Sequence, residues 1–188
     1  MSNDQHALSS EIIFQTVVPV DWNVLESFPG EGAQTQASSS NLRLLNALNI
    51  LEEIPLDGES VSSVVPESSY LEAKLDLMLG MLGELLRHQA EYPASMPVIV
   101  TATTLSVTLS AENQTGFPLP EVGDLLRVRL FLDTRYPQAL LLYGTLSSAS
   151  ETHFTVSFNS LPPPLQEQLD KFIFRQHRRA IASSRRDL

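Results

Sequence analysis

The stretch PVIVTATTLSVTL, residues 97–109, decides the fold class, because its apolar side chains recur at the two-residue period of a β-strand. They fall into two phases, first Val98, Val100 and Ala102, then Leu105, Val107 and Leu109. A one-residue change of phase predicts a bulge or bend near Thr103 and Thr104. The chain before Pro97 follows a helical period instead, so we expect a domain boundary there.

The rest of the C-terminal half repeats this strand pattern. Further strands are predicted at residues 125–132, 139–146 and 153–158, with turns at residues 113–116, 133–137 and 147–151. Three prolines at residues 162–164 end the sheet and begin a helix. Its apolar face consists of Leu165, Leu169, Phe172, Ile173 and Ala180. We therefore expect an α+β fold in which a small antiparallel β-barrel at residues 97–182 ends in a capping helix.

The N-terminal half is predicted to hold one strand, a linker and a short helix. Residues 11–20 (EIIFQTVVPV) favour a strand that Pro19 ends or confines to a sheet edge. Whether this strand packs on the same barrel or on a neighbour's is left open. Residues 27–40 are rich in Gly, Gln and Ser, which is typical of a flexible connection. Residues 41–54 predict a helix, and residues 56–69 return to loop composition. The division is a strand segment at residues 1–26 and a linker with a short helix at residues 27–69.

Residues 70–92 predict a long amphipathic helix. Ser69 and Glu72 fit a capping box at its start. Its apolar stripe has spacings of four, three, four and three residues and consists of Leu71, Leu75, Met78, Leu82 and Leu85. This spacing is the a/d pattern of a coiled coil. The stripe is a candidate oligomerisation surface, and it equally fits a helix buried in the core of one chain.

Composition bounds the class of protein. The 188 residues allow one core with a helical appendage. The chain has no cysteine, which excludes disulfides, thiolate nucleophiles and Cys-based zinc sites. No apolar run reaches the roughly 18–20 residues of a membrane span, so we predict a cytoplasmic protein. The net charge of −10 argues against a nucleic-acid binder.

The sequence contains no recognisable catalytic or metal-binding motif. His6, His88, His153 and His177 are isolated, and no pair of them has a metal-ligand spacing such as i, i+4 with a carboxylate alongside. No nucleophile elbow or glycine-rich phosphate loop occurs. We therefore expect no catalytic residue, no metal and no cofactor.

Several short motifs carry a resemblance by their order. These are Leu105-Ser106, the segment PEVGDLL at residues 120–126, VSF at residues 156–158 and LDKFIFRQHR at residues 169–178. Together they resemble the strand order and closing helix of PilZ domains, over about residues 97–180. LEAKLDLML at residues 71–79 is similar to the long helix before the barrel in an atypical PilZ subgroup that assembles through heptad-bearing helices. The resemblance implies a PilZ-like barrel and a homo-oligomer, with a tetramer as one form.

PilZ domains bind cyclic di-GMP through an R-x-x-x-R stretch and a [DN]-x-S-x-x-G stretch, and both are degenerate here. Ser106 matches the second signature, but Thr104 lacks a carboxylate or amide and Leu109 replaces the glycine. For the first signature, Arg87 stands alone with Glu91 in place of the second arginine. Guanidinium–phosphate contacts contribute about 1.5–3 kcal/mol each, so their loss weakens binding by orders of magnitude. Arg87, Thr104 and Ser106 thus form only a degenerate nucleotide site.

Two functions follow from the resemblance. The first is a non-catalytic bacterial PilZ-type signalling or adaptor protein, which acts in cyclic di-GMP-related control of motility or biofilm through an unidentified protein partner. The second is a cyclic di-GMP receptor with a non-standard site that uses basic residues such as Arg127, Arg129, Arg175 or Arg178.

Overall fold

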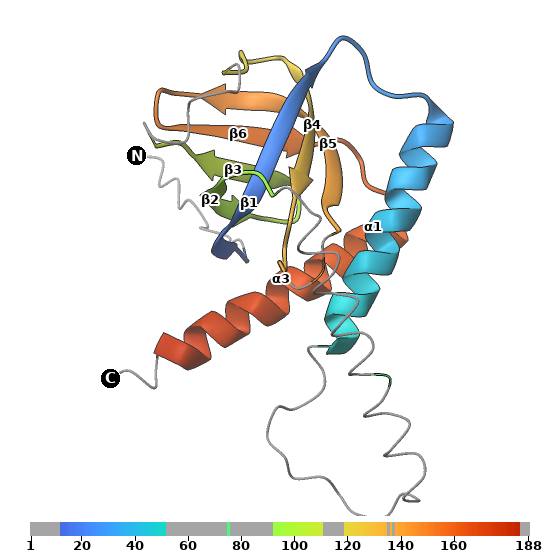
Figure 1. Cartoon of the computed structure of the whole chain (residues 1–188), viewed down its shortest axis with the longest axis vertical. Helices are drawn as coiled ribbons and strands as arrows, with labels where there is room; N and C mark the ends of the chain where they lie inside the picture. The colour runs from blue at the N-terminus through green and yellow to red at the C-terminus, as the bar shows by residue number, and fades with distance from the viewer. Residues whose placement is uncertain are drawn as a thin grey trace, which may run out of the picture.

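The fold is a closed antiparallel barrel with two helices packed against it (Figure 1). The structure is a computed structural model that describes residues 12–51, 75, 92–110, 119–134, 136 and 138–184. Its elements are β1 (Phe14–Leu25), α1 (Glu31–Leu51), β2 (Ser95–Val100), β3 (Thr104–Thr108), β4 (Leu125–Leu130), β5 (Leu140–Ala149), β6 (His153–Phe158) and α3 (Pro163–Ser184). The strand order around the barrel is β1-β2-β3-β6-β5-β4. The predicted α+β class with a small antiparallel barrel is confirmed.

Strand β1 closes the barrel and changes partner at its midpoint. Its first half pairs with β2 as far as Pro19, and its second half pairs with β4 from Val20 onward. Pro19 has no N–H to donate, and its carbonyl accepts a hydrogen bond from the Phe131 amide at 3.0 Å. The prediction that Pro19 ends the strand or confines it to an edge is therefore wrong. The strand belongs to the same barrel, which draws on residues well before Pro97.

Strands β2 and β3 form a hairpin where the sequence predicted one bent strand. Val98 pairs with Val107 and Val100 with Leu105, so both apolar phases point into the same core. The Thr101 amide donates to the Thr104 carbonyl at 2.9 Å and closes the connection. The change of phase near Thr103 and Thr104 is thus a tight turn rather than a bulge. A register shift occurs in β5 instead, between Leu146 and Ser148. Strand β5 continues to Ala149, so the predicted turn at residues 147–151 begins too early.

Helix α1 begins ten residues before the predicted helix, at Glu31. The carbonyl of Gly30 accepts from the Ala33 amide at 3.0 Å and the Gln34 amide at 3.2 Å, which places Gly30 at the N-cap. One face is buried at helical spacing and consists of Ala37, Asn41, Leu44, Leu45 and Leu48. Packing of this face outweighs the low helix propensity of the serines at residues 38–40. The prediction of a flexible connection at residues 27–40 is therefore wrong from Glu31 onward.

Helix α3 covers one end of the barrel together with α1 (Figure 1). Leu165, Leu169, Phe172 and Ile173 are buried as predicted, whereas Ala180 is exposed. The rings of Phe172 and Phe14 of β1 meet edge to face at 5.5 Å. The capping layer thus consists of two helices, where the sequence predicted one.

Several predicted features lie outside the described residues. They are most of the helix at residues 70–92, including Leu71, Met78, Leu82, Leu85 and Arg87, the turn at residues 113–116, and the helix predicted beyond Leu51. Leu75 is described, is helical and has 58% of its side chain exposed. No helix in the described ranges combines the length and the apolar character needed to cross a membrane.

Candidate functional site

Strand β3 carries the degenerate signature, and the outward side chains of Thr104 and Ser106 are hydrogen-bonded within the barrel. The Ser106 hydroxyl lies 2.8 Å from that of Thr155, directly opposite it on β6. The Thr104 hydroxyl lies 2.9 Å from that of Thr101 in the β2–β3 turn. Both side chains are therefore engaged in local hydrogen bonds that hold the sheet together.

The position where the signature requires glycine is filled by a core residue. Leu109 is 5% exposed and belongs to the main apolar cluster. Its amide donates to the Thr152 carbonyl at 2.7 Å. A residue that contributes its side chain to the core cannot provide the close backbone approach that glycine allows.

Two of the four candidate arginines lie together on the outer face of β4. The guanidinium of Arg129 forms a bidentate ion pair with Asp21 of β1, with Nε 2.9 Å from Oδ1. The Asp21 side chain is 8% exposed and that of Arg129 is 48% exposed. The hydrogen bond to Asp21 raises the pKa of Arg129 and outweighs the lowering by burial. Arg127 donates from Nη2 to Asn23 Oδ1 at 2.7 Å.

The other two arginines lie on α3. The Arg175 guanidinium donates to the Asn49 carbonyl of α1 at 2.5 Å, so it ties the two helices together. Arg178 stacks over the Phe174 ring at 5.8 Å. The four arginines thus lie on two elements, β4 and α3, and each contacts another residue of the chain. Arg127 and Arg129 lie next to each other on β4.

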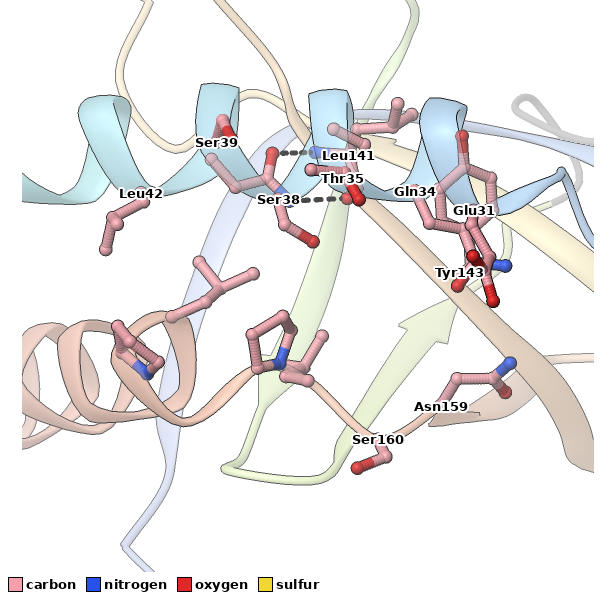
Figure 2. Close-up of a pocket in the computed structure, with 16 residues that line it drawn as sticks. Glu31, Gln34, Thr35, Ser38, Ser39, Leu42, Leu141, Tyr143, Asn159 and Ser160 are labelled. Atoms are coloured by element: carbon pink, nitrogen blue, oxygen red, sulfur yellow. Dashed lines mark hydrogen bonds between the residues drawn. The ribbon is translucent and has the colours of Figure 1, made fainter.

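A groove with a volume of about 470 Å³ lies along the first half of α1. We call it the α1 groove (Figure 2). Helix α1 forms one wall, β5 the floor, and the connection from β6 into α3 the other wall. Its main lining side chains are Glu31, Thr35, Ser38, Leu42, Leu141, Tyr143, Asn159, Ser160, Leu161 and Leu165.

Asn41 fixes the distance between α1 and the floor of this groove. Its Nδ2 donates to the Leu141 carbonyl at 2.6 Å, and its Oδ1 accepts from the Leu141 amide at 2.8 Å (Figure 2). Asn41 is 2% exposed. The helix is therefore held against β5 by a buried two-way hydrogen bond, which makes the groove a preformed feature.

Four polar side chains of the groove lining have no partner among the described residues. Thr35, Ser38, Asn159 and Ser160 make no side-chain hydrogen bond with any residue that the structure describes. Glu31 is the one charged residue among the described residues of the lining. The groove therefore offers hydroxyl, amide and carboxylate groups to a ligand, beside the apolar side chains of Leu42 and Leu165.

Sequence reasoning missed both the groove and the half-buried ion pair of Asp21 with Arg129. The serines and glutamines of α1 have the composition of a linker, and only the Pro-Gly dipeptide at residues 29–30 signals a helix start. Asp21 and Arg129 are 108 residues apart, so no local pattern relates them.

The described histidines have structural contacts. His153 Nδ1 lies 2.8 Å from the Ser150 hydroxyl, and His177 Nδ1 lies 3.0 Å from the Ile13 carbonyl. Within the described ranges, no group of three or more His, Cys, Asp and Glu residues could hold a metal ion.

Comparison with known proteins gives a family. A family model described as an atypical PilZ domain and cyclic di-GMP receptor matches residues 45–186. No curated protein sequence matches the chain.

Two solved structures are similar to this chain to different degrees. A pathogenic protein from Xanthomonas campestris, a tetrameric PilZ domain self-assembled via an unusual helical bundle, has a TM-score of 0.72 and 23% identity, over 93% of this chain and 92% of that one. The inhibitor of motility MotI/DgrA of Bacillus subtilis has a TM-score of 0.35 and 15% identity, over 45% of this chain and 42% of that one. The first similarity concerns the fold alone, and the second is too low to show a shared fold.

Proposed function

Because the chain belongs to the atypical PilZ domain family, we propose that it is a non-catalytic signalling protein that acts through protein contacts. In this proposal it does not bind cyclic di-GMP in the usual mode of the family. It works as an adaptor in the cytoplasm, in cyclic di-GMP-related regulation such as motility or biofilm control, and it has a protein partner.

The state of β3 is the observation that carries this proposal. Ser106 is the one residue that matches the second signature, and its hydroxyl is bonded to Thr155 at 2.8 Å. Thr104 is bonded to Thr101, and Leu109 is part of the core. A guanine base at this strand would have to break hydrogen bonds and would gain no carboxylate or amide in return.

Self-assembly through the stripe at residues 71–85 is the second part of the proposal. Its sequence has the coiled-coil spacing, and Leu75 is 58% exposed in a helical backbone. An exposed leucine at a seam position is what another copy of the helix would cover. The Xanthomonas campestris protein of similar fold is tetrameric, which supports testing a tetramer here.

Light scattering on the full chain tests the assembly. The double variant Leu75→Glu and Leu82→Glu places charges in the seam, and we expect the mass to fall from that of an oligomer to that of a monomer. Ala73→Glu is the matched control, because position 73 lies on the opposite side of the predicted heptad. An unchanged monomer mass for wild type and both variants would refute self-assembly.

A second candidate function is a cyclic di-GMP receptor with a non-standard site. The family model is described as a cyclic di-GMP receptor, and Arg127 and Arg129 lie together on the outer face of β4. Arg127→Gln leaves the pair of Arg129 with Asp21 intact, so it tests the site without breaking that contact. Calorimetric binding that Arg127→Gln abolishes would favour this second function over the first.

A further inference from the structure

We propose that the α1 groove binds a short extended peptide of a partner protein, with a basic residue of that peptide beside Glu31. This inference rests on the proposed adaptor function, because it names the kind of partner that the adaptor would take. The described lining of the groove includes no residue of the stripe at residues 71–85 and none of the signature strand β3.

The wall of the groove between β6 and α3 carries backbone groups that have no partner among the described residues. The Asn159 amide makes the last bond of this stretch, to the Tyr143 carbonyl at 3.0 Å. The amides and carbonyls of Ser160 and Leu161 then make no hydrogen bond with any described residue, until the Pro162 carbonyl accepts from the first turn of α3. Free backbone groups beside a sheet are the structure to which an extended peptide adds as a further strand.

The length of the groove fits a peptide of about five residues. Its lining runs along α1 from Glu31 to Leu42, which is about 16 Å at 1.5 Å per helical residue. An extended chain covers that distance with about five residues. The volume of about 470 Å³ lies within the range of ligand sites.

The two ends of the groove differ in chemistry, and this difference predicts which side chain of the peptide lies at which end. Glu31, Tyr143 and Asn159 lie together at one end, while Leu42 and the start of α3 lie at the other (Figure 2). Among the described residues, the lining contains no Lys, Arg or His. A carboxylate without a cation attracts a positive side chain and disfavours phosphate, so a dinucleotide does not fit this groove.

We therefore expect a ligand with three features. Its backbone pairs with one of the two neighbouring residues Ser160 and Leu161, because consecutive residues of an extended chain present their backbone groups to opposite sides. A Lys or Arg lies beside Glu31, and an apolar side chain lies on Leu42. Between these two anchors, the hydroxyls of Thr35 and Ser38 form hydrogen bonds with polar side chains of the peptide. A neutral small molecule is the competing occupant, and it would need no extended backbone.

The test uses a positional-scanning library of acetylated, amidated heptapeptides and fluorescence anisotropy with the full chain. We expect binding peptides to share a Lys or Arg at one end and an apolar residue three or four positions away. Methylation of one of the two sets of alternate backbone amides in the best peptide should abolish binding, because it removes the donor to the free carbonyl of Ser160 or Leu161.

Matched variants place the binding in the groove. Thr35→Arg fills the groove and adds a positive charge, so it should weaken the best peptide by about tenfold or more. Gln36→Arg introduces the same side chain at an exposed helix position that does not line the groove, and it should change affinity less than about twofold. Glu31→Gln should remove the preference for a terminal cation, an effect of up to about fivefold.

Four outcomes would overturn the inference. They are no heptapeptide binding below about 1 mM, equal weakening by Thr35→Arg and Gln36→Arg, full binding of the methylated peptide, and unchanged cation preference in Glu31→Gln. Equal binding of the methylated peptide would assign the groove to side-chain or small-molecule recognition instead. Light scattering of the same variants keeps the two proposals apart, because a failed peptide test with an unchanged oligomer mass overturns this inference alone.

Discussion

The outer face of β3 and the α1 groove are both lined by hydroxyl groups, yet they use them in opposite ways. On β3, the hydroxyls of Thr104 and Ser106 are bonded to neighbouring threonines of the sheet. In the groove, Thr35 and Ser38 have no side-chain hydrogen bond among the described residues. A polar group that is already paired stabilises the fold, and one that is unpaired is available to a ligand.

This contrast separates structure from recognition in one small chain. The strand where the family signature would lie has become part of the framework, since its inward residues fill the core. The α1 groove, in contrast, has preformed walls, because Asn41 holds α1 on β5. The predictions below test whether the two regions differ in this way.

The largest expected effect lies on the inward side of β3. Leu105 has 0% of its side chain exposed, so Leu105→Ala should lower the free energy of unfolding by about 2–5 kcal/mol. Urea denaturation followed by circular dichroism measures the change. A loss below about 0.5 kcal/mol would mean that β3 does not contribute to the core as described.

In the groove region, we expect the contact of Asn41 with β5 to stabilise the fold and the Ser38 hydroxyl to contribute little to stability. Asn41→Ala removes both bonds to Leu141 and leaves that buried backbone unpaired, so it should cost about 1–3 kcal/mol. Ser38→Ala, three residues earlier on the same helix, should change the free energy of unfolding by less than about 0.5 kcal/mol. Equal losses in the two variants would show that Ser38 is a structural residue and would remove the contrast.

The ion pair of Asp21 with Arg129 should have an intermediate effect. Asp21→Ala removes the hydrogen bonds to a half-exposed guanidinium, so we expect a loss of about 1.5 kcal/mol, the low end for a charged hydrogen bond. Asn23→Ala serves as the control, because it removes one bond to Arg127 on the same strand. Thermal unfolding at neutral pH compares them, and a greater loss for Asn23→Ala would contradict the assigned pair.

The smallest structural effect concerns the outward side of β3. Ser106→Ala removes the bond to Thr155 and should cost about 0.5–1.5 kcal/mol. Thr108→Ala is the matched control at an outward position with no side-chain hydrogen bond to the described residues, and its effect should be near zero. If both variants have wild-type stability, Ser106 is free for another role and the interpretation of β3 is wrong.

Local patterns predicted the strands of the C-terminal half well. Residues 153–158 form β6 as predicted, because Phe154 and Val156 alternate with outward residues at the period of a strand. The degenerate [DN]-x-S-x-x-G signature was also visible in the sequence, because all of its positions lie within residues 104–109. Features of this kind depend on neighbours in sequence.

Features that depend on distant partners were missed. A strand that changes partner at Pro19 has the sequence pattern of a strand that stops there, because the two partners β2 and β4 are remote in sequence. The serines of α1 fold as a helix only because Ala37 and Leu44 have a surface to pack on. The α1 groove combines residues 31–42 with residues 159–165, so it exists only in the folded chain.

Calorimetric titration of the full chain with cyclic di-GMP at low salt tests the central claim most directly. The occupied hydroxyls of β3 and the buried Leu109 predict no saturable heat, which corresponds to a dissociation constant weaker than about 100 μM. A dissociation constant of about 1 μM or tighter that Ser106→Ala abolishes would contradict it, because the usual site would then be functional.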